Sequence, residues 1–310
     1  MFRRTPRILA AVLTVAALAL SGCAGDARDD NPTPTGSGDA AFPVTVGELT
    51  LDKRPERIVS LAPVATETLF AIGAGAQVVA VDEMSNYPPE APRTTLSGYK
   101  PNAEAIAGYA PDLVVISNDM DNISASLATL KIPVYLAPAA QTLDDVYAQI
   151  EDFGKLTGHA DEAADLTRRM RDEIAKLVGD LPERSKKLTY FYELDPTLYT
   201  VTSKTFVGSL FALAGLENVA DPSDTTGSGY PQLSAEALVK ANPDLIFLAD
   251  TKCCGQSPET VKARPGWADI TAVRTGQIIV LDDDIASRWG PRVTDLVRAI
   301  TEAVAKVPEA

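Results

Sequence analysis

Few residues in this chain have the types and spacing needed for catalysis. The 310-residue sequence contains a single histidine, His159, so a Ser-His-Asp arrangement elsewhere in the chain has no second imidazole to use. The sequence has no Gly-x-Ser-x-Gly turn and no glycine-rich phosphate loop. Its acidic residues fall mostly on predicted helix faces and turns, as solvated charge does. We therefore expect no catalytic residue, no cofactor and no directly bound metal.

The three cysteines form one isolated residue and one adjacent pair. Cys23 stands alone near the N-terminus, whereas Cys253 and Cys254 are neighbours without the ligand spacing of a zinc site. In an oxidising compartment the pair either forms a vicinal disulfide or stays as two buried thiols. A disulfide after a strand would present a flat apolar face to a ligand. The sequence leaves both states open.

The first residues have the pattern of an export signal. Arg3, Arg4 and Arg7 precede an apolar run at 8–20, which is shorter than the roughly 20 residues of a membrane span. Leu20-Ser21-Gly22-Cys23 follows and resembles a lipobox, so we expect a signal peptide at 1–22 and a lipid on Cys23. The alternative is a plain signal peptide and an incidental cysteine.

The export signal implies that the mature chain lies outside the cytoplasm, and the composition after it predicts a tether. Residues 23–42 are rich in Asp, Pro, Thr, Gly and Ser without apolar periodicity, which predicts a disordered segment. The formal net charge is −14, and removing the signal peptide makes the chain more acidic still. Such a surface disfavours nucleic acid and anionic lipid. We expect a lipid-anchored, extracytoplasmic monomer.

The body of the chain alternates short apolar strands with helices. This order predicts an α/β fold with two Rossmann-like lobes and parallel sheets, at 43–141 and 181–310. A hairpin is expected at 44–51. The other expected strands are 57–61, 78–81, 113–116, 134–136, 188–192, 246–249 and 278–281, and the expected helices are 66–72, 122–130, 207–214 and 293–304.

Between the lobes, the segment at 142–180 has sustained helical periodicity. Apolar residues recur from Val146 to Leu177, and Gly154 and Gly158 are its weak points. We expect one rigid helix of some thirty residues over 143–177, about 45–50 Å long, which joins the two lobes.

The two lobes carry an internal repeat. Ala103-Glu104-Ala105-Ile106 precedes Pro111-Asp112-Leu113, and Ala235-Glu236-Ala237-Leu238 precedes Pro243-Asp244-Leu245 at the same spacing. Two equivalent lobes that face each other leave a cleft between them, which is a natural ligand site.

These segments resemble the substrate-binding proteins of ABC importers for ferric siderophores and cobalamin. The resemblance covers most of residues 43–305 and implies small hinge motion, a permease dimer with a cytoplasmic ATPase as partner, and no enzymatic activity. A single histidine argues against the zinc- and manganese-binding relatives. The matching stretches are Pro55 to Pro63 with Thr66-Glu67, Tyr87 to Glu90, Pro101 to Glu104, Pro111 to Val114, and Gly290-Pro291-Arg292.

The resemblance also assigns residues to docking and to the cleft. Glu104 and Glu236 match the glutamates that pair with permease arginines; the alternative is a glutamate that stabilises a helix N-terminus. Resemblance to the cobalamin-binding branch implies ligand contacts on aromatic and polar residues, although each aromatic alone is more typical of core packing. These candidates are Tyr87, Tyr99, Tyr199, Tyr230, Asp284 and Arg288, with Trp289 adjacent.

Two further loops bear on the cargo. The polar run 117–122 and the acidic run 282–284 are either a solvated loop and a helix cap, or the lining of a cleft for cationic or hydroxyl-rich ligands. The cargo is expected to be a bulky metal chelate, with ferric siderophore and cobalamin both open. A two-lobed surface lipoprotein with an adhesion or structural role is the alternative function.

Overall fold

The computed structural model describes residues 42–308. The predicted signal peptide, Cys23 and all but the last residue of the predicted tether lie outside this range, so those predictions stay predictions. In the part of the chain that is described, no helix is long and apolar enough to cross a membrane.

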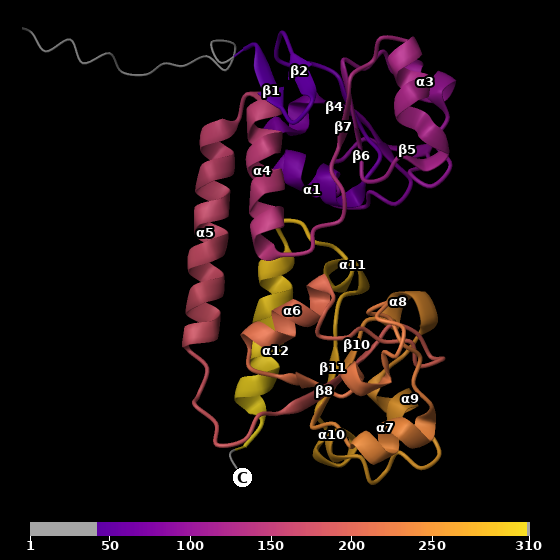
Figure 1. Cartoon of the computed structure of the whole chain (residues 1–310), viewed down its shortest axis with the longest axis vertical. Helices are drawn as coiled ribbons and strands as arrows, with labels where there is room; N and C mark the ends of the chain where they lie inside the picture. The colour runs from indigo at the N-terminus through magenta and orange to yellow at the C-terminus, as the bar shows by residue number, and fades with distance from the viewer. Residues whose placement is uncertain (1–41, 309–310) are drawn as a thin grey trace, which may run out of the picture. The chain divides into compact units, whose positions relative to one another are not determined.

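A parallel sheet forms the core of the N-terminal lobe (Figure 1). Its strand order is β5-β4-β3-β6-β7, and short helices connect the strands. An antiparallel hairpin of β1 (Val44–Val46) and β2 (Leu49–Leu51) precedes it, as expected. The strands of the sheet are β3 (Ile58–Ser60), β4 (Val78–Asp82), β5 (Arg93–Leu96), β6 (Leu113–Ile116) and β7 (Val134–Leu136). The helices are α1 (Pro63–Ala71), α2 (Ala103–Ala107) and α3 (Ile123–Thr129), with 3-10 turns η2 (Ala74–Gln77) and η3 (Met120–Asn122).

The C-terminal lobe repeats this plan with a smaller parallel sheet in the order β11-β10-β8-β9. Strand β10 is buried along its length, which agrees with its apolar sequence, and β8 is buried except at Thr189. The strands are β8 (Thr189–Glu193), β9 (Glu217–Asn218), β10 (Leu245–Leu248) and β11 (Ile278–Val280). The helices are α6 (Phe206–Leu213), α7 (Ala235–Ala241), α8 (Thr251–Cys254), α9 (Pro258–Lys262), α10 (Thr271–Thr275), α11 (Asp283–Ala286) and α12 (Val293–Lys306), with a 3-10 turn η4 (Asp221–Ser223).

The expected single helix over 143–177 is wrong, because two antiparallel helices occupy this segment. Helix α4 (Leu143–Thr157) ends at Gly158, whose left-handed φ of 74° lets its N–H bond to a carbonyl of the last turn. His159 then precedes α5 (Ala160–Gly179), and its backbone N–H bonds to the Gly154 carbonyl. Gly158 therefore marks the end of α4, and Gly154 marks a close contact between α4 and α5.

The long helix between the lobes is α5, which has 20 residues and a length of about 30 Å. It lies beside α4 of the N-terminal half and beside α12 of the C-terminal half (Figure 1). Buried apolar residues of all three helices belong to one hydrophobic cluster that includes both sheets. The α/β class with parallel sheets and a long connecting helix is confirmed.

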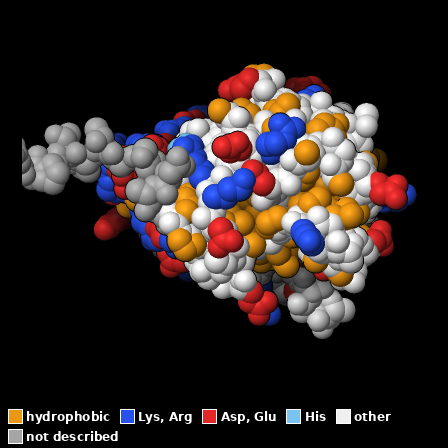
Figure 2. Space-filling view, turned by 90° about the horizontal axis from the view of Figure 1, so that it is seen from above, with side chains coloured by type: hydrophobic (Ala, Val, Ile, Leu, Met, Phe, Trp, Pro, Cys, Tyr) orange, Lys and Arg blue, Asp and Glu red, His pale blue; other side chains and the backbone are white. Residues whose placement is uncertain are grey.

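The outer end of the N-terminal lobe carries charge of both signs. Figure 2 views this end and shows Lys and Arg side chains mixed with Asp and Glu around a band of hydrophobic side chains. The net negative charge of the sequence is therefore not gathered into one continuous acidic surface on this face.

The contact between α4 and α5 gives a first prediction. A Cβ atom on Gly154 would lie 2.5 Å from the Ala163 Cβ and 2.9 Å from the His159 carbonyl oxygen. Replacing Gly154 by alanine should therefore overpack the helix pair and lower the free energy of unfolding by about 1–3 kcal/mol. Urea unfolding followed by circular dichroism measures this.

Gly179→Ala is the matched control, because a Cβ there meets nothing within 4 Å. It should leave the urea midpoint nearly unchanged. Equal midpoints for the two variants would show that α4 and α5 do not pack as closely as described.

Candidate functional site

Each sheet has a point where its strand order reverses. Strand β3 lies between β4 and β6, and β8 lies between β9 and β10, so successive connections leave on opposite sides of these first strands. Open α/β sheets bind ligands in the crevice beyond the carboxyl ends of the strands at such points. In this protein a cavity lies at each of the two points.

The first cavity belongs to the N-terminal lobe and has a volume of about 270 Å³. The loop after β3 and the loop after β6 form its floor, so it lies at the reversal point of the five-stranded sheet. Residues of both lobes line it, including Leu61, Pro63, Tyr99, Asn118, Asp284 and Trp289.

The second cavity belongs to the C-terminal lobe and has a volume of about 480 Å³. Leu194 follows β8 and Ala249 follows β10, and both line this cavity. Ser287, Arg288 and Trp289 line both cavities. The two cavities are thus halves of one cleft, and the segment after α11 separates them.

A buried carboxylate joins the lobes beneath this segment. The Glu67 side chain on α1 is 1% exposed and accepts hydrogen bonds from two arginines of the other lobe. Arg288 Nη1 lies 2.8 Å from Glu67 Oε1, and Arg292 Nε lies 2.8 Å from Glu67 Oε2. Arg292 also stacks on the Tyr87 ring, 4.2 Å from its centroid. We call Glu67, Arg288, Arg292, Asp284 and Lys252 the interlobe cluster.

The remaining donors of Arg288 also reach protein oxygens. Its Nη2 donates to Asp284 Oδ1 at 2.8 Å and to the Met84 carbonyl at 3.2 Å, and its Nη1 donates to Asn86 Oδ1 at 2.9 Å. Met84 and Asn86 belong to the N-terminal lobe, so Arg288 ties the lobes together at several points. Both terminal nitrogens of Arg288 are therefore in use within the protein.

Lys252 completes the cluster from α8. Its Nζ donates to Asp282 Oδ2 at 2.8 Å and to Asp284 Oδ2 at 2.9 Å. Burial favours the neutral form of the Asp284 carboxyl, but hydrogen bonding to Lys252 and the charge of Arg288 outweigh it and lower the Asp284 pKa below its usual value. The cluster thus favours the ionised form of Asp284.

A second acidic group, which sequence reasoning missed, lines the first cavity. Asp82 ends β4, is 2% exposed, and accepts a hydrogen bond from the Ser85 N–H at 2.8 Å. Burial raises the pKa of Asp82, in opposition to the hydrogen bonds from Ser85. The continuous apolar run of β4 hid this residue, because a polar residue at a strand end is equally typical of a turn.

Most of the aromatic and polar candidates lie at the cleft, and two do not. Tyr99, Asp284, Arg288 and Trp289 line the first cavity, and Tyr230 lines the second. Tyr99 and Tyr230 are 66% and 54% exposed, so their rings are available to a ligand. Tyr87 and Tyr199 are exposed but line neither cavity.

The glutamates that were assigned to docking have the same local structure in the two lobes. Glu104 and Glu236 are each the second residue of a short helix, and both are exposed. Asn102 and Ser234 cap these helices by accepting hydrogen bonds from the third residue of each helix. The internal repeat is therefore seen both in the sequence and in the way the two helices are capped.

The adjacent cysteines form a disulfide in α8. Cys253 and Cys254 are exposed and line neither cavity. The expectation that they present an apolar face to a ligand in the cleft is therefore not supported by their position. Across residues 42–308, no group of three or more His, Cys, Asp or Glu side chains is arranged to hold a metal ion.

A buried acidic pair lies at the end of the central strands of the C-terminal lobe. Glu193 ends β8 and is paired with Arg264, whose Nη1 lies 2.7 Å from Glu193 Oε2. Asp250 follows β10, is fully buried, and its carboxyl oxygens have no hydrogen-bond partner among the described residues. Burial and the neighbouring Glu193 carboxylate raise the pKa of Asp250 to about 7.

Comparison with known proteins gives consistent matches over nearly the whole chain. Residues 58–285 match the family model described as periplasmic binding protein. The chain is 31% identical to the uncharacterized ABC transporter substrate-binding lipoprotein YvrC of Bacillus subtilis, with 95% of each protein covered. It is also 31% identical to a cobalamin-binding protein of Halobacterium salinarum, over 96% of this chain and 84% of that protein.

A solved structure shows the same arrangement. The periplasmic vitamin B12 binding protein BtuF of Vibrio cholerae is 27% identical, with a TM-score of 0.65 over 81% of this chain and 96% of BtuF. These relatives are binding proteins rather than enzymes, so the expectation that the chain is not an enzyme is confirmed.

The interlobe cluster gives a second prediction. Glu67→Gln removes the charge that neutralises Arg288 and Arg292, and breaking a fully buried ion pair costs about 3–5 kcal/mol of unfolding free energy. We expect the lower end of this range, because the Arg292 side chain is 18% exposed. Urea unfolding of the variant and of the wild type measures the difference.

The control is Asp165→Asn, which breaks an exposed pair with Arg168 and should cost less than about 1 kcal/mol. If Glu67→Gln were no more costly than this control, the carboxylate would not be the buried link between the lobes.

Asp250 gives a third prediction, on pH dependence. Its pKa is raised from 3.8 to about 7, so between these values the folded protein keeps a proton that the unfolded chain releases. Stability should therefore fall as pH rises from 4 to 7, with a slope of up to about 1.4 kcal/mol per pH unit from this group.

Asp250→Asn should flatten this slope and gain stability relative to wild type as pH rises. Thermal unfolding at intervals between pH 4 and 8 tests it, with Asp269→Asn as an exposed control. Parallel profiles for wild type and Asp250→Asn would rule out a raised pKa at Asp250.

Proposed function

Because this chain belongs to the periplasmic binding protein family of ABC transporters, we propose that it captures a bulky metal chelate outside the cytoplasm and delivers it to a permease. The observation that carries this proposal is the cleft, since each lobe contributes the reversal point of its sheet and the two halves share Arg288 and Trp289. Ligand sites of binding proteins and enzymes alike favour such positions.

Cobalamin is the first candidate for the cargo, and a ferric siderophore is the second. A relative of similar length is named a cobalamin-binding protein, and the solved relative is named a vitamin B12 binding protein. The lining of the cleft supports a broad ligand, because the exposed rings of Tyr99 and Tyr230 and the indole of Trp289 offer apolar faces at low entropic cost.

The residues of the cleft divide into those that cover the cargo and those that fix its orientation. Tyr99, Tyr230 and Trp289 cover its faces. Asp82 and Asn118 in the first cavity offer polar contacts to its amide or hydroxyl groups. Tyr87 and Tyr199 lie outside the two cavities, and we propose that they contact parts of the cargo that project from the cleft.

Delivery involves the two exposed glutamates and the lipid anchor. We propose that Glu104 and Glu236 pair with arginines of a permease dimer, which is driven by a cytoplasmic ATPase. Their equivalent positions on two capped helices suit a two-fold symmetric partner. A lipid on Cys23 would keep the protein near that partner, and one relative is itself named a lipoprotein.

A titration of the mature protein tests the cargo. Cyanocobalamin, a ferric hydroxamate and a ferric catecholate are each added while Trp emission and calorimetric heat are recorded. We expect one of them, cyanocobalamin first, to bind at micromolar concentration or below. Tyr99→Ala should weaken that binding by about tenfold, because truncating an aromatic contact commonly costs more than 1 kcal/mol.

Leu130→Ala is the control, because Leu130 is an exposed apolar side chain that lines neither cavity. Absence of heat and of any emission change with all three chelates would reject the proposed cargo class.

Capture of the loaded protein by detergent-solubilised permease tests delivery and separates transport from an adhesion or structural role. Glu104→Ala with Glu236→Ala should reduce the affinity by about 5- to 150-fold per residue, since a desolvated charge contact is worth about 1–3 kcal/mol. Chelate binding should not change.

Glu259→Ala is the matched control, because Glu259 also lies in the first turn of a short helix behind a serine cap. If the double variant and this control bound the permease equally well, the docking role of the two glutamates would be wrong. If no permease bound the wild type, the adhesion or structural role would be favoured.

A further inference from the structure

The disulfide in α8 is not explained by stability or by the cleft. It joins neighbours in the sequence, and a cross-link that closes so short a loop removes little conformational freedom from the unfolded chain. Both cysteines are exposed, so a small thiol or a thiol-bearing protein can approach the Sγ atoms. Thiols can therefore react with this bond, whereas they would not reach a buried structural disulfide.

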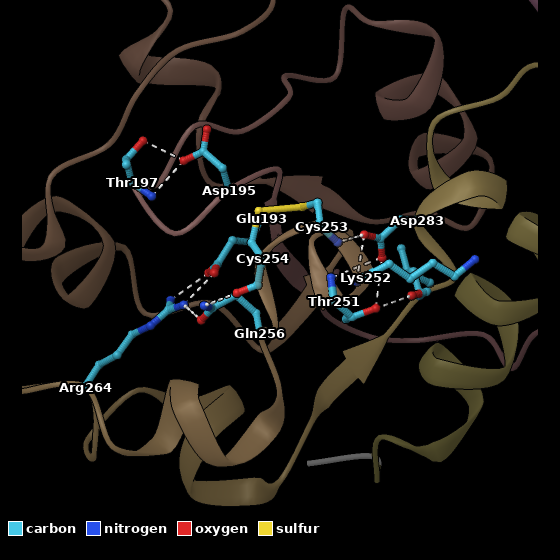
Figure 3. The surroundings of a disulfide bond; sticks show 11 residues. Glu193, Asp195, Thr197, Thr251, Lys252, Cys253, Cys254, Gln256, Arg264 and Asp283 are labelled. Atoms are coloured by element: carbon cyan, nitrogen blue, oxygen red, sulfur yellow. Dashed lines mark hydrogen bonds and ion pairs between the residues drawn. A yellow bond between two sulfur atoms is a disulfide. The ribbon is translucent and has the colours of Figure 1, made fainter. Parts of the chain in front are cut away.

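On one side, the backbone of α8 is bonded to α11 through a single carboxylate. Asp283 accepts four hydrogen bonds from α8 (Figure 3). Their donors are Thr251 N at 3.1 Å, Thr251 Oγ1 at 2.9 Å, Lys252 N at 2.8 Å and Cys253 N at 3.0 Å. The Asp283 carboxylate of α11 thus caps the N-terminal N–H groups of α8, and any change in that turn acts first on Asp283.

On the other side, the turn is fixed to the body of the lobe. Gln256 Nε2 donates to the Cys254 carbonyl at 3.3 Å, and Gln256 Oε1 accepts from Arg264 Nη2 at 2.7 Å. Arg264 is held in turn by the buried Glu193. Figure 3 shows the disulfide between this group and Asp283. The turn is thus held by hydrogen bonds on both sides, and Asp283 is its backbone link to α11.

Helix α11 leads directly to the cleft. Asp284 of this helix belongs to the interlobe cluster, and Lys252 of α8 bonds to it at 2.9 Å. Ser287, Arg288 and Trp289 follow the helix and separate the two cavities. A continuous set of hydrogen bonds and ion pairs therefore connects the disulfide turn with the residues between the halves of the cleft.

We propose that the Cys253–Cys254 disulfide is a thiol-exchange site whose reduction loosens α11 and weakens ligand binding in the cleft. The proposed co-reactant is a dithiol, either a small molecule or a dithiol oxidoreductase. This proposal rests on the proposed function for its effect on the ligand, although the coupling to α11 is measurable without any ligand.

A thiolate of the dithiol attacks one Sγ, the Sγ–Sγ bond breaks, and the other cysteine leaves as a thiolate that takes a proton from water. The second thiol of the reagent then attacks the mixed disulfide and releases the remaining protein cysteine as a thiol. Two electrons and two protons pass to Cys253 and Cys254, and the reagent leaves as its own disulfide.

Reduction changes α8 because the disulfide is a strong local restraint on a weak element. A helix of four residues has little stability of its own, since nucleation is costly. Without the bond, the N–H groups of Lys252 and Cys253 are free to leave Asp283. That carboxylate then loses its donors beside Asp282 and Asp284, and repulsion among the three acidic groups favours a displaced α11.

Hydrogen–deuterium exchange tests the coupling directly. The full chain is used in a Cys23→Ser background, so that every counted thiol comes from the pair, with and without dithiothreitol. Reduction should expose two thiols per molecule and speed amide exchange at 251–256 and at 282–289. The affinity for cyanocobalamin should fall by about 2- to 30-fold, the range expected for a coupled element.

Two variants sharpen the result. Cys253→Ser with Cys254→Ser should show the fast exchange of the reduced protein and no response to dithiothreitol. Asp283→Ala removes the backbone link but leaves the Lys252–Asp284 ion pair, so reduction should still speed exchange at 251–256 and should change it much less at 282–289. Asp269→Ala, which changes an exposed acidic residue away from this turn, should behave like the parent.

Several results would overturn the proposal. One is two free thiols in the protein before any reductant is added and after mild oxidation. Another is complete reduction that leaves exchange at 282–289 unchanged. If cyanocobalamin binds neither redox form while exchange at 282–289 still responds, the cargo is wrong and the coupling stands. Equal affinity of both forms with altered exchange would reject the effect on binding.

Discussion

The architecture depends on one buried carboxylate that faces two arginines. Glu67 comes from the first helix of one lobe, and Arg288 and Arg292 come from the last part of the other, so residues more than two hundred positions apart share a single charge contact. An unpaired charge at this depth is strongly unfavourable, so losing either side of the contact while the other stays buried is costly. The relative position of the lobes is therefore fixed by chemistry at the cleft as well as by α5.

The same cluster sets the character of the ligand site. Arg288 lies between the two halves of the cleft, yet its terminal nitrogens are bonded to Glu67, Asp284, Asn86 and Met84. In the function proposed here, polar selection of a ligand would fall to groups with spare hydrogen-bonding capacity, such as Asp82 at the end of β4. Aromatic rings at the rim would supply the contact area. The cleft is shaped by interactions that are complete before a ligand arrives.

Much of the fold could be predicted from the sequence, because buried parallel strands read as short apolar runs and the repeat exposed the two lobes. Strands β5 and β9 were missed because Arg93–Leu96 is mostly polar and Glu217–Asn218 is very short, as edge strands often are. The helix break at Gly158 was hidden because the apolar period continues through it. Tyr99, Tyr230 and Trp289 were placed at the cleft by resemblance, whereas the pairing of Glu67 with Arg288 depends on long-range packing that no local pattern reveals.

The unequal halves of the cleft have a consequence for symmetry. The cavities of about 270 and 480 Å³ give a bound cargo a distinct orientation, with one end in each lobe. The two glutamate-bearing helices, in contrast, are nearly equivalent. A permease with two-fold symmetry would accept the protein in two poses that differ by half a turn, and the cargo would arrive reversed in one of them. Transport through such a partner requires a pathway that does not distinguish the two ends of the cargo.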